Sequence, residues 1–203
     1  MAAPPARGRP RSQRARRAVL EAARAIVEKD GYDAATIEAI AERAEVAKTT
    51  IYRWWPNRAA LIVDLLMEMA AHAVPLPSGP DPLGAIRTEM RGIGRAADHL
   101  MGRLLASLVG EAQRDPEIRA ALLDGLFHPR SDATAKMVRM AQAAGIVRKD
   151  IPAHVAVDLL VGPIFYRMLV RHQPLTDTFV SQVFRIVTAG LEEQGRIGAR
   201  SRG

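Results

Sequence analysis

The amino-acid sequence predicts an all-α protein, on three observations. Apolar residues make up 48% of the 203 residues but aromatic residues only 4%, so the core must consist mainly of Ala, Leu, Val, Ile and Met, which suits packed helices better than sheets. Apolar side chains recur at helical spacing between Gly and Pro residues that separate one segment from the next. No segment shows the apolar–polar alternation typical of a strand. We expect about nine helices.

Four of these helices are expected before a Pro-rich loop at residues 72–82. Gly31 ends the first, and Thr36 can cap the second. A short connection, Glu45-Val46, precedes the third helix at about residues 47–54, which Pro56 breaks. Asn57 can cap the fourth. The apolar stripes of the first, second and fourth helices consist of Val19, Ala23, Ile26 and Val27, of Ile37, Ile40, Ala41 and Ala44, and of Leu61, Leu65, Leu66 and Met69.

Five further helices are expected after the loop. The third of them is expected to be interrupted near His128-Pro129, because proline cannot donate a helical hydrogen bond. The five helices span about residues 83–100, 101–113, 116–144, 152–171 and 176–191. The resulting division is a disordered basic arm at 1–13, a unit of short helices at 14–58, a larger helical domain at 59–195 and a flexible tail at 196–203.

Composition narrows the class of protein. The chain has no cysteine, which excludes disulfides and thiolate metal sites. No apolar run approaches the roughly 18 residues that a membrane span requires, and no apolar segment follows the basic N-terminus as in a secretory signal. We therefore expect a soluble, cytoplasmic protein with no membrane partner.

Positive charge is concentrated in the first third of the chain. Residues 1–60 hold twelve Lys and Arg against seven Asp and Glu, whereas the remainder holds seventeen against fifteen. Such a distribution is expected where a domain meets a polyanion. A solvated basic surface is the alternative interpretation, and charge alone does not decide between them.

The short second and third helices, joined by a tight turn, have the helix-turn-helix arrangement, in which the second of the pair enters the major groove. At 100° per residue, Ala47, Ile51 and Trp55 share the inward face. Thr49 and Arg53 then point outward. The exposed side has hydroxyl, guanidinium and phenol groups and no acid, which suits contacts with bases and phosphates. An ordinary polar helix remains the alternative.

The stretch from Arg17 to Leu61, RAVLEAARAIVEKDGYDAATIEAIAERAEVAKTTIYRWWPNRAAL, resembles the DNA-binding domain of the TetR/AcrR family of transcriptional regulators. The matching elements are EAARAIVEKDGYDAATIEAIAERA, VAKTTIY, the aromatic Trp55 and NRAAL. The segment DLLVGPIFYRMLV from Asp158 to Val170 resembles the penultimate helix of many such regulators more loosely.

The resemblance implies a homodimer that binds a palindromic double-stranded operator, with an effector site in the C-terminal domain and dimerisation through the last two helices. Two residues depart from the family pattern. Ala47 replaces a small hydroxyl residue, so the third helix lacks a side-chain cap, and Trp54 stands where His or Tyr is common. The implied DNA contacts are Thr36, Lys48, Thr49, Thr50, Tyr52, Trp54 and Arg58; the outward direction adds Arg53, and the basic residues beside the first helix add Arg14, Arg16 and Arg17.

Residues of the C-terminal domain are assigned more loosely. Apolar stripes on two sides of the last helices predict a two-fold four-helix bundle, with Leu159, Gly162, Leu169, Val180, Val183, Phe184, Val187 and Leu191 at the interface. Methionines fill cores more often than they line pockets, but Met-rich helices form adaptable cavities. The pocket candidates, for a hydrophobic or neutral effector, are Met67, Met101, Leu105, Phe127, Met137, Phe165 and Tyr166.

No catalytic, metal-binding or cofactor-binding pattern is found. The five histidines, at 72, 99, 128, 154 and 172, have no spacing typical of a metal site. The sequence therefore predicts a transcriptional repressor that a small molecule releases from its operator. An activator or an effector-independent repressor of the same fold is the first alternative, and an all-α enzyme fused to a helix-turn-helix is the second.

Overall fold

A computed structural model describes residues 9–97 and 99–192 of the chain. These residues form ten α-helices and one π-helical segment, with no strand beyond a single bridge between Val147 and Glu192. The helices are α1 Arg9–Asp30, α2 Ile37–Arg43, α3 Lys48–Tyr52, α4 Arg58–Ala73, α5 Pro82–Ala97, α6 Leu100–Ala112, α7 Pro116–Leu122, α8 His128–Ala143, α9 Ala153–Val170 and α10 Asp177–Leu191, and the π-helical segment is η1 Leu123–Phe127.

The all-α prediction is confirmed, and most predicted boundaries lie close to the observed ones. Thr36 Oγ1 accepts a hydrogen bond from the backbone N–H of Ala39 over 3.1 Å, and Asn57 Oδ1 accepts one from Ala60 over 2.8 Å. These two bonds cap α2 and α4 as the sequence indicates.

The N-terminal boundary needs correction. Helix α1 begins at Arg9, within the segment expected to be a disordered arm up to residue 13. Pro10 lies in its first turn, where a missing N–H costs nothing, and the Arg, Gln and Ala residues that follow favour a helix. The rest of the expected arm and the expected tail at 196–203 lie outside the described residues.

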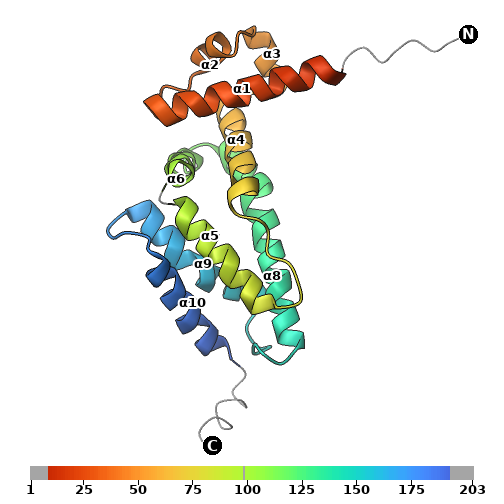
Figure 1. The fold of residues 1–203 in the computed structure, drawn as a ribbon, viewed down its shortest axis with the longest axis vertical. Helices are drawn as coiled ribbons and strands as arrows, with labels where there is room; N and C mark the ends of the chain where they lie inside the picture. Colours follow the sequence, from red (N-terminus) through yellow and green to blue (C-terminus); the bar gives the residue numbers. More distant parts are fainter. Residues whose placement is uncertain (1–8, 98, 193–203) are drawn as a thin grey trace, which may run out of the picture.

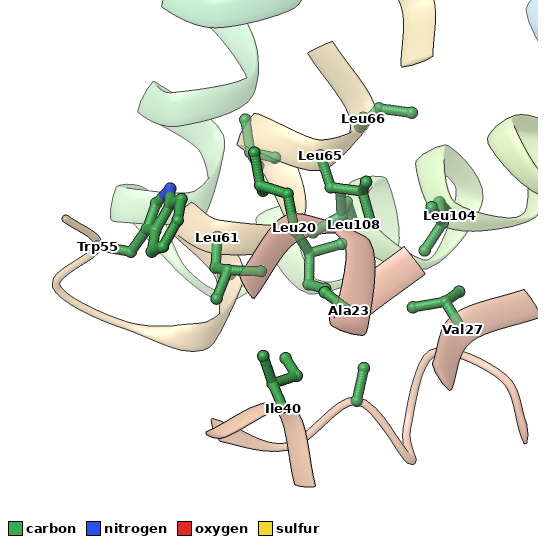
Figure 2. Close-up of a cluster of buried hydrophobic side chains, with 14 of the residues drawn as sticks. Leu20, Ala23, Val27, Ile40, Trp55, Leu61, Leu65, Leu66, Leu104 and Leu108 are labelled. Atoms are coloured by element: carbon green, nitrogen blue, oxygen red, sulfur yellow. The ribbon is translucent and has the colours of Figure 1, made fainter. Parts of the chain in front are cut away.

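A continuous apolar core joins the first three helices to the helices beneath them. Figure 2 shows Leu20, Ala23 and Val27 of α1 with Ile40, against leucines of α4 and α6. In Figure 1, α1 lies across the upper part of the molecule beneath α2 and α3, and α4 runs downward below it. The head, which we define as α1–α3, is therefore packed on α4 and α6 through a continuous core.

A second core lies between α5, α8, α9 and α10. It forms the lower part of the molecule in Figure 1. Gly94 of α5 allows α10 to come close, because a Cβ there would lie 2.7 Å from Cγ2 of Val180. The buried face of α9 includes Ala156, Leu160 and Ile164.

The predicted interruption near His128-Pro129 is a π-helical turn. Pro129 cannot donate to the carbonyl four residues earlier, and the helix changes register over Leu123–Phe127 before α8 begins at His128. A π turn redirects the side chains that it contains. This change divides the helix expected at 116–144 into α7 and α8, which accounts for ten α-helices where nine were expected.

Helix α9 is apolar on more than its buried side. Its 18 residues have a mean hydropathy of 1.5, which would suffice for a membrane span. This differs from the sequence expectation, which counted uninterrupted apolar residues and therefore stopped at Asp158 and Arg167. Core and interface helices of soluble proteins have the same composition, so the finding is weak support for a membrane location.

Candidate DNA interface and effector cavity

The turn between α2 and α3 fixes the angle of the helix-turn-helix. The N–H of Glu45 donates to the carbonyl of Glu42 over 3.2 Å, and that of Val46 to Ala41 over 3.0 Å. These two bonds form a Schellman motif. Glu45 occupies the left-handed position with φ 53°, which usually belongs to glycine.

Ile51 and Trp55 face inward and the polar side of α3 faces solvent, as predicted, whereas Ala47, which was expected on the inward face, is exposed because it lies at the N-cap before the first turn. Ile51 is fully buried and Trp55 is 4% exposed, whereas Tyr52 is 52% and Trp54 37% exposed. Ala47 at the N-cap makes no side-chain cap bond. The other proposed contact residues are Lys48, Thr49 and Arg53, which are exposed, and Thr50, which is half-buried.

One acid lies close to this polar side. Lys48 Nζ donates to Glu38 Oε1 of α2 over 2.7 Å. The hydrogen bond raises the pKa of Lys48 and lowers that of Glu38. A DNA phosphate would have to compete with Glu38 for this ammonium group.

The three arginines expected to contact phosphates have different surroundings. Arg14 is exposed, and Arg17 is exposed beside Glu21 on the same helix. Arg16 is instead held by Asp64 of α4 at 2.5 Å, and Asp64 also accepts from Trp55 Nε1 over 2.8 Å. This ion pair joins α1 to α4, and the predicted phosphate contact of Arg16 stays a prediction that requires the phosphate to compete with Asp64.

Arg58 also has an acidic partner within its own chain. Its Nη2 donates to Glu111 Oε1 of α6 over 3.1 Å, and its guanidinium carbon lies 4.3 Å from the centre of the Tyr32 ring. Tyr32 donates from its hydroxyl to Glu111 Oε2 over 2.8 Å. We call Tyr32, Arg58 and Glu111 the head–body joint, because they connect the head, α1–α3, to the remaining helices, which form the body. Arg58 contacts α6 there, and its predicted DNA contact stays a prediction.

Burial and the hydrogen bond to Glu111 raise the pKa of Tyr32 to about 12. The phenol therefore remains protonated at physiological pH and serves as a donor. Tyr32 lies directly after Gly31, which follows the last residue of α1. Its hydrogen bond to Glu111 therefore connects the end of α1 to α6.

An apolar cavity of about 280 Å³ lies below the joint, between α4, α5, α6, α8, α9 and the π turn. Four pocket candidates line it: Met101, Leu105, Phe127 and Phe165. The rings of Phe127 and Phe165 lie 5.6 Å apart. The exposed lining residues Leu123, His128 and Asp158 mark its opening.

Three pocket candidates lie elsewhere. Met67 packs against the π turn at Gly125, where a Cβ would meet its sulfur. Met137 belongs to the second core, and Tyr166 is 59% exposed and lies beside His172. Their helical neighbours are in the cavity wall, but their own side chains point to other faces of the helices.

Sequence analysis did not identify the polar group of the cavity, which consists of Glu89, Arg130 and Thr134. Thr134 Oγ1 lies 2.7 Å from Glu89 Oε2, and Arg130 Nη1 lies 3.6 Å from Glu89 Oε1. Arg130 Nη2 donates to the carbonyls of Ala70 and Val74 at the end of α4. Burial raises the pKa of Glu89. A signal was available in the sequence, since Glu89 falls on the apolar face of α5.

The predicted dimerisation residues are divided between the two sides of their helices. Val180, Val183 and Leu191 are buried in the second core, and Phe184 and Val187 are half-buried against it. Val180, Val183 and Leu191 are therefore corrected to core positions of the same chain, because α10 packs this side on α5 and α9, whereas the interface role of the partly exposed Phe184 and Val187 stays a prediction. Leu159, Gly162 and Leu169 are exposed as predicted.

An exposed apolar row runs along the outer side of α9. Val155, Leu159, Tyr166 and Leu169 follow one another at spacings of three and four residues around Gly162. Ile186 of α10 is 66% exposed. Tyr166 and Ile186 were absent from the predicted interface, because a helix that is apolar all round does not show which side its own subunit covers.

Known protein families match both the N-terminal and the C-terminal part of the chain. Residues 19–65 match the family described as bacterial regulatory proteins, tetR family, and residues 76–187 match the tetracyclin repressor-like, C-terminal domain. The HTH-type transcriptional regulator YdeS of Bacillus subtilis is 32% identical over 92% of this chain and 94% of its own length. The DNA-binding transcriptional repressor TetR of Mycobacteroides abscessus is 28% identical over 88% of this chain and 92% of its own.

Solved structures have the same architecture. The TetR family transcription regulator SCO0332 superposes with a TM-score of 0.75 at 28% identity, over 88% of this chain and 99% of that one. The regulator FadR from Bacillus subtilis, solved in complex with stearoyl-CoA, shares the fold with a TM-score of 0.67 at 15% identity, over 87% of this chain and 99% of that one. The matched helix-turn-helix and the matched helical domain together cover most of the protein, which therefore belongs to the TetR family of DNA-binding transcription regulators.

Proposed function

We propose that the protein is a cytoplasmic, homodimeric repressor that binds a palindromic operator through α3 of each subunit and leaves it when a small molecule fills the cavity. The observation that supports this most strongly is the outer side of α3. This side has two threonines, a tyrosine and an arginine, and Ile51 and Trp55 on the opposite side pack into the core. Helix α3 itself contains no acid.

The exposed row on α9 and Ile186 support the proposed dimer. A row at spacings of three and four residues is the pattern of a helix–helix seam. Nothing lies within 4 Å of the position that a Cβ of Gly162 would take, so a partner helix can approach closely there. Two copies of α9 and α10 would form a two-fold bundle that buries this row.

Helix α6 offers a route from the cavity to the DNA-binding head. Met101 and Leu105 line the cavity, and Glu111 of the same helix belongs to the head–body joint. An effector that favours a displaced α6 would shift the population toward a different spacing of the two heads. Heads whose spacing misfits successive major grooves would release the operator.

Relatives support repression and a ligand in general terms. The relative from Mycobacteroides abscessus is named a transcriptional repressor, and the FadR structure of the same fold holds stearoyl-CoA. An activator, or a repressor without an effector, uses the same DNA-binding head. We do not extend the proposal to an enzyme, because the family consists of transcription regulators.

The experiment is a DNA-binding titration with Arg53→Ala and Tyr52→Phe. Each lost base or phosphate contact should cost about 1–3 kcal/mol, and a dimer loses it twice. The matched control is Arg139→Ala, an exposed arginine of α8. Circular dichroism should show unchanged helix content. Wild-type affinity in both variants would show that α3 does not contact DNA.

A further inference from the structure

We propose that the effector is a small neutral molecule with an apolar body and one oxygen, such as a phenol, an alcohol or a ketone, whose oxygen binds Arg130 beside Glu89. This inference rests on the proposed effector role of the cavity and defines the chemistry that the cavity selects. It is based on two observations: the cavity is mostly apolar, and its polar group includes a buried donor nitrogen of Arg130 that has no hydrogen-bond partner in the described part of the chain.

The unused donor is Arg130 Nη1. This nitrogen is buried and has no hydrogen-bond partner within the described part of the chain. The nearest carboxylate oxygen, Glu89 Oε1, lies 3.6 Å away, beyond a good hydrogen bond. Nη2 is already occupied by the carbonyls of Ala70 and Val74. A buried donor without a partner is costly, so an oxygen placed beside Nη1 would be bound favourably.

The charge of the same group selects against ions. Arg130 and Glu89 face each other, and Thr134 Oγ1 contacts the carboxyl without adding charge. A carboxylate that approached Arg130 would also approach Glu89, and an ammonium group that approached Glu89 would also approach Arg130. Both ions would in addition lose their hydration in an apolar enclosure. A neutral oxygen avoids these costs, and a hydroxyl can also donate to Glu89.

The other residues that line the cavity limit the size and shape of the effector. Leu66, Leu105, Leu126, Val157 and Phe165 make most of the wall apolar. A volume of about 280 Å³ is near the lower end for small-molecule sites. The ionisable residues His128 and Asp158 are exposed at the opening rather than beside Arg130. A compact molecule of one or two rings, with its oxygen inward, fits this arrangement.

The test uses four molecules of matched shape and different charge: 2-naphthol, 2-naphthoate, 2-naphthylmethylammonium and 2-methylnaphthalene. Their binding to the full-length protein is measured by calorimetry at neutral pH. A hydrogen bond from a charged donor corresponds to about tenfold or more in affinity. We therefore expect 2-naphthol to bind about tenfold more tightly than each of the other three.

The variant Glu89→Gln tests the charge argument without changing the shape of the side chain. It leaves Arg130 as the only charge of the polar group, so 2-naphthoate should bind about tenfold more tightly than it binds wild type. Arg130→Met should abolish the preference for 2-naphthol, although it also removes the bonds to α4. The exposed Arg139→Met on the same helix should leave all four affinities unchanged.

Two results would overturn the proposal. One is a wild-type preference for either ion or for 2-methylnaphthalene, and the other is the absence of 2-naphthol binding at millimolar concentration. Unchanged 2-naphthoate affinity in Glu89→Gln would overturn the assigned role of Glu89. DNA binding by the same preparations is measured without any probe, so a failure of effector selectivity remains distinguishable from a failure of the regulator function.

Discussion

Replacing Tyr32 with Phe removes one hydrogen bond from the head–body joint and keeps the ring on which Arg58 stacks. The lost bond runs from the Tyr32 hydroxyl to Glu111 Oε2 over 2.8 Å. Glu111 keeps its ion pair with Arg58 at 3.1 Å. The variant therefore isolates a single contact between the end of α1 and α6.

The magnitude follows from the partner and its exposure. A hydrogen bond to a charged group contributes about 1.5–3 kcal/mol where it is buried. The Glu111 side chain is 38% exposed, so water competes for it, and we reduce the expected loss to about 1 kcal/mol. In a protein of this size, that loss corresponds to a fall in melting temperature of about 2–4 °C.

A double-mutant cycle of Tyr32→Phe and Glu111→Ala in urea separates the hydrogen-bonded pair from other effects, because each variant alone removes the bond. The expected coupling energy is about 1 kcal/mol. Tyr52→Phe is the matched control, because its hydroxyl lies on the exposed side of α3, and it should leave the unfolding free energy nearly unchanged. A coupling energy below about 0.3 kcal/mol would refute the joint as a stabilising contact between head and body.

Three further predictions concern other parts of the fold. Ile186→Glu should yield folded monomers in sedimentation at micromolar concentration, and a folded dimer of this variant would contradict the proposed interface. Val183→Glu should instead unfold the protein, because only Val183 is buried within its own chain. Glu45→Gly should raise the unfolding free energy by about 0.5–1 kcal/mol, because glycine adopts the left-handed conformation without strain, and a loss measured in urea would argue against that strain. Burial raises the pKa of Glu89 above its ordinary 4.5, so ionisation of Glu89 lowers the unfolding free energy as the pH rises from 4.5 through this raised pKa. The unfolding free energy of Glu89→Gln relative to wild type should therefore increase over that interval and level off above it, and a pH-independent difference would contradict this.

The sequence predicts the features that depend on local chemistry. Thr36 and Asn57 cap helices because a side-chain oxygen needs only the N–H three residues later. Pro129 interrupts its helix because the missing N–H is a property of that residue alone. The form of the interruption was not predictable, since a π turn depends on how the surrounding helices hold Leu123–Phe127.

Roles that depend on distant partners were not predictable. Arg16 and Arg58 look like phosphate contacts in a basic segment, but their carboxylate partners, Asp64 and Glu111, lie 48 and 53 residues further along the chain. The interface on α10 was misplaced for the same reason. An apolar stripe shows that a side is buried but not by which chain, and Val183 is covered by its own subunit.

The most direct test of the central claim is selection of DNA by the full-length protein from a pool of random duplexes, followed by anisotropy titration of the enriched sequence. The account predicts an inverted repeat whose half-site centres lie about one helical turn or a multiple of it apart, bound by one or more dimers and lost in Arg53→Ala. No enriched sequence, or an enriched sequence that Arg53→Ala and Tyr52→Phe bind as tightly as wild type, would contradict the claim that α3 recognises an operator.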